Sequence, residues 1–389
     1  MSQSRADTLR AHFSSPNGAP RPLLTSLNGD NSWLMSFPRP AAERARPGSK
    51  AYFHIVSDPW LTGYASAGAS WVISIRTVTP AAIPSGAAVE AVISEIENTA
   101  AAASENLISA PRSINDPEPS PIDAIFLNFH YSDHLDEATL RTFHPEIPVF
   151  ATAEAAAIVR RWGHFSHVTE TRDLDPATAP GGTGAWRSLH PRGSLPDWLT
   201  VFRLRGHHEL NFATAIIYSS SPSSSSVPSS STSSRGGGGG GGGGEEDHET
   251  KHEALLYSPH GIKADQPALK AFVGYLDSAG DSDGGKVSVL VILHALKDSF
   301  AFGMATTLGV AGGLALERLT RPRYWVKSHD APLGYAGIVA WVAWVNDVAR
   351  TLRSGLDEEK EEVNGGEDRG ERKEPNVVEV ENGGCFVLE

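Results

Sequence analysis

The chain has 389 residues, 40% of them hydrophobic, and a formal net charge of −13. This length allows one large buried core, and the acidic balance excludes a general nucleic-acid surface, which needs clustered Lys and Arg to bind phosphates. Because Cys385 is the only cysteine, an intramolecular disulfide and zinc held by thiolates are excluded as well, and we expect a reducing, cytoplasmic location.

The first 22 residues mix Arg, Ser, Asp and Pro, so we expect a flexible N-terminus without a secretory signal. Strands and helices are then predicted along 23–353, which we take as one α/β domain with sheets covered by helices. The predicted strands are 32–37, 51–56, 70–75, 124–128, 149–151, 200–205, 287–293 and 324–327, and the predicted helices are 88–103, 137–143, 153–162 and 307–319. No apolar run reaches the roughly 20 residues that cross a bilayer, so no membrane partner is expected.

A serine run followed by a glycine run interrupts this domain, and we expect a disordered insertion over 219–252. The flanking segments 213–218 and 254–257 both have the apolar composition of a buried strand. A flexible loop between paired strands costs little more as it lengthens. The two flanking strands are therefore predicted to be neighbours in one sheet.

The C-terminal region begins with a predicted helix over 335–352, followed by a run rich in Glu, Lys, Arg and Gly. This run predicts an acidic flexible linker over 354–375. Two short apolar segments, 377–380 and 385–388, then enclose a glycine turn. This pattern predicts a closing β-hairpin over 376–389 that returns to the same domain.

Potential metal ligands follow the predicted strand 124–128, in the sequence Asn-Phe-His-Tyr-Ser-Asp-His. His130, Asp133 and His134 lie within five residues of one another, and imidazole and carboxylate are common partners of zinc. Polar groups at the C-terminal end of a buried strand are also where α/β proteins bind ligands. The alternative is a structural role, in which Asp133 caps the helix that follows.

Further polar residues share this position after a strand. Asp58 follows 51–56, His260 follows 254–257, and His329 with Asp330 follows 324–327. Each alone can be structural, since Asp-Pro starts turns and a histidine near a turn commonly forms ordinary hydrogen bonds. His294 ends another predicted strand, where it would either contact a substrate or pack inside the protein.

On these residues the chain resembles the metallo-β-lactamase superfamily, in a divergent branch similar to the ascorbate-phosphate lactonase-like proteins. The resemblance rests on Asp58-Pro-Trp-Leu, Asp133-His134, the Tyr-Ser-Pro-His that ends at His260, and the segment 324–330. It implies a four-layer αβ/βα sandwich whose metals lie at one edge, where the strand ends meet. Asp58, His294 and Asp330 would then lie behind the ligands or against the substrate.

The family's main motif, His-x-His-x-Asp-His, is altered in this sequence. Aligned on Asp133 and His134, Phe129 and Tyr131 occupy the positions of the first two histidines. His260 takes the place of the later metal-bridging aspartate, and His329 matches the final histidine. With His130 as a substitute ligand, the resemblance implies a site for one zinc ion.

Two functions follow from this site. The first is a metal-dependent hydrolase of a small ester, lactone or phosphoester, in which Asp133 either binds the metal or acts as the catalytic general base. The second is a non-catalytic member of the fold that acts as a binding or interaction protein. The altered motif favours the second function, and the remaining ligands at strand ends favour the first.

Overall fold

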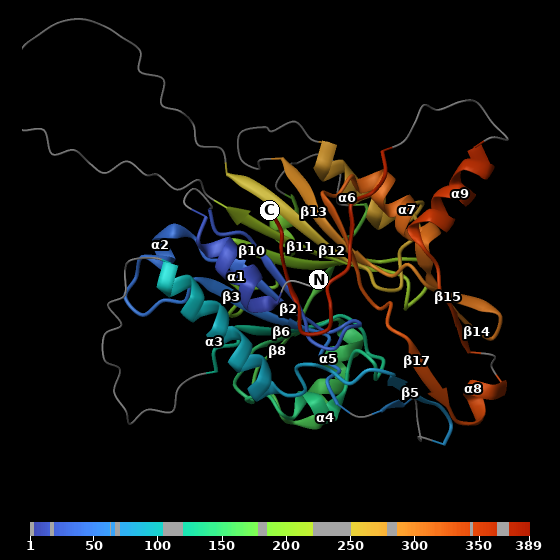
Figure 1. Cartoon of the computed structure of the whole chain (residues 1–389), viewed down its shortest axis with the longest axis horizontal. Helices are drawn as coiled ribbons and strands as arrows, with labels where there is room; N and C mark the ends of the chain where they lie inside the picture. Colours follow the sequence, from blue (N-terminus) through green and yellow to red (C-terminus); the bar gives the residue numbers. More distant parts are fainter. Residues whose placement is uncertain are drawn as a thin grey trace, which may run out of the picture.

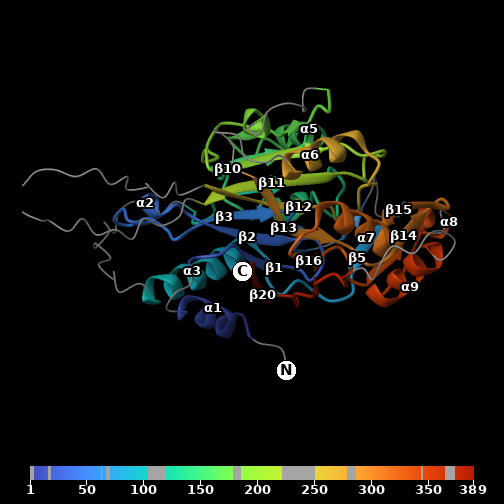
Figure 2. The ribbon, with the colours of Figure 1, turned by 90° about the horizontal axis from the view of Figure 1, so that it is seen from above.

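Two mixed β-sheets face each other in the computed structural model, which describes residues 4–15, 19–62, 64–66, 71–103, 120–177, 185–220, 250–277, 286–342, 345–363 and 373–389. The first sheet has seven strands in the order β20-β1-β2-β3-β6-β7-β8, and the second has seven in the order β19-β16-β13-β12-β11-β10-β9. Helices cover the outer faces of both sheets (Figures 1 and 2).

The strands of the first sheet are β1 (Leu23–Ser26), β2 (Trp33–Pro38), β3 (Tyr52–Ser57), β6 (Ala124–Leu127), β7 (Val149–Ala151), β8 (Val168–Glu170) and β20 (Cys385–Val387). Those of the second are β9 (Arg172–Asp173), β10 (Leu199–Leu204), β11 (Ala213–Ser220), β12 (Lys251–Tyr257), β13 (Val287–His294), β16 (Tyr324–Lys327) and β19 (Val377–Val378). The helices are α1 (Arg5–Phe13), α2 (Ala41–Arg44), α3 (Gly86–Ala103), α4 (Glu137–Leu140), α5 (Ala153–Trp162), the 3-10 turn η1 (Ala185–Leu189), α6 (Pro267–Asp277), α7 (Gly309–Thr320), α8 (Ile338–Val342) and α9 (Leu352–Val363).

Three separate hydrophobic clusters fill the spaces between the layers. One lies between the sheets and includes Phe37 and Leu255. The second joins the first sheet to its helices through side chains such as Ile93 of α3, and the third joins the second sheet to its helices through Phe272 of α6. Three filled spaces require four layers, so the predicted four-layer αβ/βα sandwich is confirmed. Burial on both faces explains why the central strands are continuous apolar runs.

The strands on either side of the low-complexity insertion are neighbours, as predicted. β11 and β12 pair antiparallel, from Thr214 with Tyr257 to Ser220 with Lys251. The predicted bounds of the insertion, 219–252, are wrong at both ends, because β11 continues through Ser220 and β12 begins at Lys251. The prediction of disorder for 221–249 lies outside the described residues.

The prediction of a flexible N-terminus is wrong for residues 5–13, which form α1. The Ser4 side chain caps the helix by accepting a hydrogen bond from the Asp7 amide. Leu9 is fully buried, and Arg5 forms an ion pair of 2.6 Å with Glu95 of α3. Phe13 also packs against Tyr52, and Arg5 donates to the Gly383 carbonyl. These contacts are made with residues far away in the chain and leave no periodic pattern in the sequence.

The predicted helix over 335–352 is also wrong. The chain there forms β17 (Leu333–Ala336), the short helix α8 and β18 (Asn346–Val348). Helix α9 then runs from Leu352 to Val363 and occupies the first half of the predicted linker. An apolar run of this length has no clear period, so strand and helix cannot be told apart from it.

The predicted closing hairpin at the C-terminus is wrong as well, because its two strands do not pair with each other. β19 pairs with β16 of the second sheet, whereas β20 pairs with β1 of the first. The glycine turn between them, where Gly383 has φ of +82°, carries the chain from one sheet to the other. Both strands complete the open edge of a larger sheet, which offers more hydrogen bonds than a hairpin between them.

Two three-stranded sheets extend the sandwich on one side (Figure 1). Their orders are β15-β14-β18 and β17-β5-β4. Their remaining strands are β4 (Ala65–Ser66), β5 (Ser74–Thr77), β14 (Asp298–Ala301) and β15 (Met304–Leu308). Among the described helices, none is long and apolar enough to cross a membrane.

Candidate metal centre

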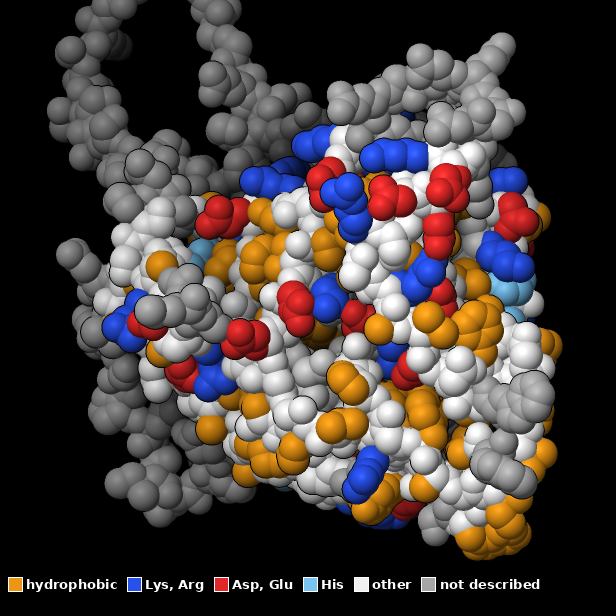
Figure 3. Space-filling model, turned by 45° about the vertical axis from the view of Figure 1, so that its right-hand side comes forward, with side chains coloured by type: hydrophobic (Ala, Val, Ile, Leu, Met, Phe, Trp, Pro, Cys, Tyr) orange, Lys and Arg blue, Asp and Glu red, His pale blue; other side chains and the backbone are white. Residues whose placement is uncertain are grey.

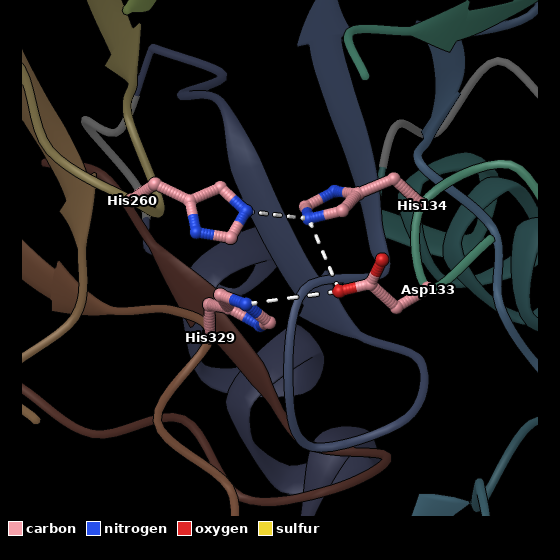
Figure 4. A group of neighbouring side chains, drawn as sticks. All are labelled: Asp133, His134, His260 and His329. Atoms are coloured by element: carbon pink, nitrogen blue, oxygen red, sulfur yellow. Dashed lines mark hydrogen bonds and ion pairs between the residues drawn. The ribbon is translucent and has the colours of Figure 1, made fainter. Parts of the chain in front are cut away.

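Four potential ligands converge where strand ends of both sheets meet (Figure 4). Asp133 and His134 lie in the turn between β6 and α4, whereas His260 follows β12 and His329 follows β16. The turn is closed by a hydrogen bond of 2.9 Å from the His134 amide to the Tyr131 carbonyl. Residues from opposite sheets therefore share one edge of the sandwich.

The ligand atoms of these four residues all lie within 4.8 Å of one another. Nε2 of His134 is 3.1 Å from Nε2 of His260 and 3.8 Å from Oδ2 of Asp133. Nε2 of His329 is 3.9 Å from the same carboxylate oxygen. The three histidines are buried, and the Asp133 side chain keeps 13% of its surface exposed.

Each histidine is held from behind through its Nδ1 atom. Nδ1 of His134 donates to Oδ2 of Asp58 at 2.9 Å, and Nδ1 of His329 donates to Oδ2 of Asp30 at 2.8 Å. Nδ1 of His260 lies 3.2 Å from Oγ1 of Thr307. A carboxylate only accepts, so at least two of the imidazoles carry their proton on Nδ1. Such partners orient the imidazole ligands in metal sites, and here they turn Nε2 toward the shared centre.

The supporting carboxylates are themselves fixed. Oδ1 of Asp58 accepts hydrogen bonds from the backbone amide and the side-chain amide of Asn128, at 2.7 and 3.1 Å. Oδ1 of Asp30 accepts from the Ala331 amide at 3.0 Å. Burial alone would raise the pKa of Asp30, but its contacts with His329 and the charge of Lys297 outweigh burial and lower the pKa to about 2. Asp30 is therefore ionised at neutral pH.

Two residues of this edge adopt a left-handed backbone. Asp58 has φ of +44° and His329 has φ of +63°, a region that residues other than glycine seldom adopt. Such strain persists where surrounding contacts fix the conformation, and it is common at functional sites. The left-handed backbone of Asp58 places its carboxylate against His134, and that of His329 places its imidazole against Asp30.

The electrostatic environment shifts the pKa values of the two closest imidazoles, His134 and His260, in opposite directions. Burial opposes the charged form of His134, but the carboxylates of Asp133 and Asp58 outweigh it and raise its pKa. Burial and the neighbouring His329 and His134 lower the pKa of His260 well below its ordinary value. Two Nε2 lone pairs 3.1 Å apart repel each other, so a proton or a cation is needed between them.

The donor set fits a zinc ion. Ligands at about 2.0–2.1 Å in a tetrahedron lie roughly 3.3 Å apart, and the separations of 3.1, 3.8 and 3.9 Å are close to this value. Three imidazoles and one carboxylate are ligands that zinc accepts. The four residues can therefore hold a metal ion with small movements of their side chains.

An aromatic wall closes one side of the centre. The ring centroid of Phe129 lies 4.4 Å from that of His134 and 5.1 Å from that of His260, and Phe129 stacks on Phe212 at 4.3 Å. Tyr131 is half-buried, its ring contacts that of His130, and its hydroxyl donates to Glu209. The two altered motif positions thus differ in their ring contacts, because Phe129 contacts His134 and His260, whereas Tyr131 contacts His130.

The structure does not bring His130 into this group. Successive residues of an extended chain point to opposite sides, and His130 faces a neighbouring cleft of about 280 Å³ that His207, His208 and Arg205 also line. His130 is thus placed away from the other expected ligands.

The remaining expected residues lie around the centre. Asp58 directly supports His134. His294 is fully buried, with Nδ1 donating to the Ala295 carbonyl, and its ring packs against Gly261, next to His260. Asp330 accepts hydrogen bonds from the Leu296 and Lys297 amides. Asp330 thus fixes a loop beside the centre, whereas Nε2 of His294 is buried without a hydrogen-bond partner among the described residues.

Sequence reasoning missed Asp30 and Thr307. Asp30 follows β1 in the turn Asn-Gly-Asp-Asn, so it has the same position after a strand that identified Asp58. That signal was available in the sequence. Thr307 lies inside β15, although the sequence predicted that a helix begins at this residue; α7 begins at Gly309 instead.

No protein-family model and no curated protein matches this sequence. Solved structures resemble it at low identity. They include an isothiocyanate hydrolase from Delia radicum gut bacteria (12% identity, 94% of this chain and 99% of that one, TM-score 0.46) and a possible metal-dependent hydrolase from Veillonella parvula (10%, 95% and 100%, 0.46). A third is the metallo-β-lactamase fold protein YhfI from Bacillus subtilis (9%, 94% and 99%, 0.39). Similarity at this level gives no evidence about the ligands or the reaction of this chain.

Proposed function

We propose that this chain is a metal-dependent hydrolase that holds one zinc ion between His134, His260 and His329. The main support is the inward orientation of the three Nε2 atoms, each backed by a partner on Nδ1. Three protein ligands with a fourth position left open are the arrangement of catalytic zinc. The substrate is then a small ester, lactone or phosphoester, and lactones are the first class to screen, in line with the sequence resemblance.

A bound zinc ion would supply a water of pKa near 7 and polarise the scissile carbonyl or phosphoryl group. Asp133 supplies the proton transfer: its carboxylate lies 3.8 to 3.9 Å from two of the Nε2 atoms and is partly exposed. From there it can accept the proton of the attacking water and return it to the leaving group. Phe129 excludes solvent from one side, which strengthens the electrostatic interactions at the centre.

The second candidate is a non-catalytic binding protein, and the position of Asp133 favours it. Its carboxylate is close enough to the three imidazoles to act as a fourth ligand. A zinc ion with four protein ligands has no open position, which is the arrangement of structural zinc. The two candidates therefore differ in whether Asp133 is a base or a ligand.

Elemental analysis of the purified protein, together with lactone and phosphodiester assays, tests the proposal. We expect about one zinc per chain in the wild type and none in a His134→Ala/His329→Ala double variant. Asp133→Asn should keep the zinc and slow hydrolysis by about 10²- to 10⁴-fold, the usual contribution of a general base, and Glu209→Gln serves as the carboxylate control. Absence of metal from the wild type overturns the proposal. Bound zinc without hydrolysis, and lost in Asp133→Asn, establishes the second candidate.

A further inference from the structure

Exposed apolar side chains gather on one part of the molecule. In the described part of the chain, the large hydrophobic side chains that are well exposed all lie on the two three-stranded sheets, on α8 or on the turns beside them. They are Tyr64, Trp71, Val78, Phe302, Met304, Ile338, Val342 and Val348, with exposures from 39% to 68%. We name this region, residues 64–66, 71–78, 298–308, 333–342 and 345–348, the apolar lobe.

The apolar lobe projects from the sandwich beside the second sheet (Figure 1), and hydrophobic side chains are prominent on the corresponding part of the surface (Figure 3). Soluble monomers seldom expose a large contiguous apolar patch unless it binds something. The concentration of these side chains in one place therefore indicates a binding surface.

Asp347 ties the two small sheets of the lobe together. Its carboxylate accepts hydrogen bonds from the hydroxyl of Tyr335 on β17 at 3.0 Å and from that of Ser299 on β14 at 2.7 Å, and it pairs with Lys297 at 3.0 Å. The Ile338 amide also donates to the Trp71 carbonyl at 3.0 Å, which fixes α8 against the turn before β5. These bonds make the lobe one connected unit.

Each small sheet has one strand that lies close in sequence to residues around the metal centre. β15 carries Thr307, whose hydroxyl lies 3.2 Å from Nδ1 of His260. The exposed Met304 is three residues earlier on this strand, which corresponds to about 10 Å at 3.3 Å per residue. β17 begins four residues after His329. One strand of each small sheet is thus close in sequence to a residue that supplies or supports the centre.

Tyr335 marks the junction between the lobe and the centre. Burial and the neighbouring Asp347 raise the pKa of its hydroxyl, and the carboxylates of Asp133 and Asp30 add to this effect. Those two carboxylates belong to the metal centre, so Tyr335 lies within their electrostatic range. Its side chain is half-buried, and its hydroxyl donates to Asp347 of the lobe.

We propose that the apolar lobe binds the acyl chain or aromatic group of the substrate, so that the metal centre acts on hydrophobic esters or lactones. This inference rests on the proposed hydrolase function. Strands β15 and β17 both lead from residues around the metal centre into the apolar lobe. This connection supports a substrate as the molecule that the lobe binds. The net charge of −13 disfavours both an anionic membrane and close approach of a second copy, because like charges repel.

A series of p-nitrophenyl esters from acetate to decanoate, hydrolysed by the zinc-loaded protein, tests this proposal. We expect kcat/KM to rise about fourfold for each methylene buried on the lobe. In a Trp71→Ser/Ile338→Ser double variant the rise should fall below twofold per methylene. The conservative pair Trp71→Phe/Ile338→Val and the surface change Lys270→Ser, on α6, should keep the steep dependence.

A binding measurement separates this inference from the proposed function. Calorimetry with the uncharged alcohols hexanol, octanol and decanol on the metal-free protein should show affinity that rises with chain length in the wild type and is nearly flat in the serine double variant. If this result is obtained but no ester is hydrolysed, binding by the apolar lobe is supported and the proposed hydrolase function is overturned. Equal binding by wild type and serine variant overturns the lobe even if esters are cleaved. The lobe is also overturned as a substrate site if the wild type is a dimer and the serine variant is a monomer. Binding to phosphatidylcholine vesicles without binding of the alcohols overturns it in the same way.

Discussion

The carboxylate of Asp30 accepts a hydrogen bond of 2.8 Å from Nδ1 of His329, almost three hundred residues later in the chain. The pair joins the turn after β1 of one sheet to the turn after β16 of the other. Because Asp30 is ionised, it accepts from Nδ1 and leaves the lone pair of Nε2 facing the metal centre. One buried carboxylate thus sets the orientation of a proposed ligand.

Replacing Asp30 by Asn should weaken metal binding without unfolding the protein. The amide keeps the shape of the carboxylate but loses its charge, so His329 is held less firmly; changes of this kind typically lower metal affinity 10- to 100-fold. Zinc titration against a competing chelator measures the effect. Asp136→Asn is the matched control, because Asn caps α4 as well as Asp does. Equal affinity in both variants would show that Asp30 has no part in the site.

The two altered motif positions should respond differently to substitution. Phe129→Ala removes a fully buried ring that packs against His134, His260 and Phe212, so the free energy of unfolding should fall by about 3–5 kcal/mol. Tyr131→Phe removes only a hydroxyl near the surface and should cost under about 1 kcal/mol. Urea denaturation of both variants measures the difference. Similar losses would contradict the aromatic wall.

Acid should destabilise the fold partly through Glu253. Burial alone would raise the pKa of this carboxyl, but hydrogen bonds from Arg21 and Tyr218 outweigh it and lower the pKa from 4.5 to about 2. The stabilisation is therefore complete above pH 4.5 and is lost as the pH falls from 4.5 toward 2, with a full value of about 3 kcal/mol.

Chemical denaturation at a series of pH values checks this contribution. Glu253→Gln should be less stable than the wild type at pH 7, and the difference should shrink as the pH falls below 4.5. Glu137→Gln, at a surface pair with Arg141, should show little difference at any pH. A constant difference for Glu253→Gln would rule out titration of this group as the cause.

Helix α1 should contribute measurably to stability. Leu9 is its fully buried residue, so Leu9→Ala should lower the free energy of unfolding by about 2–4 kcal/mol. Arg10→Ala, on the exposed face, should change it by less than about 0.5 kcal/mol. Thermal denaturation of the two variants compares them. No loss in Leu9→Ala would support the original expectation of a flexible N-terminus.

Strand ends were the part of the site that the sequence could predict. His134, His260 and His329 each follow an apolar run that forms a buried strand, and such runs are readable because both sheet faces are covered. Phe129 and Tyr131 were visible as altered motif positions, but their different surroundings depend on packing from Phe212 and Glu209. Those contacts join residues far apart in the chain, and no local pattern encodes them.

Segments whose pairing is decided by distant partners were predicted least well. The C-terminal strands have the local pattern of a hairpin, yet open sheet edges at β16 and β1 determine where they pair. The run 335–352 is apolar over a length that suits a helix, whereas its hydrogen bonds go to β5 and β14. Local propensity was overruled by tertiary contacts in both places.

The pairing of β20 with β1 has a consequence for how the chain is made. Thr25 of β1 pairs with Cys385, so one edge of this early, fully buried strand has no partner until a segment 360 residues later in the chain has been synthesised. An apolar strand with an open edge is a template for pairing between chains. Messages that end before codon 385 should therefore yield insoluble aggregates rather than a shortened soluble protein.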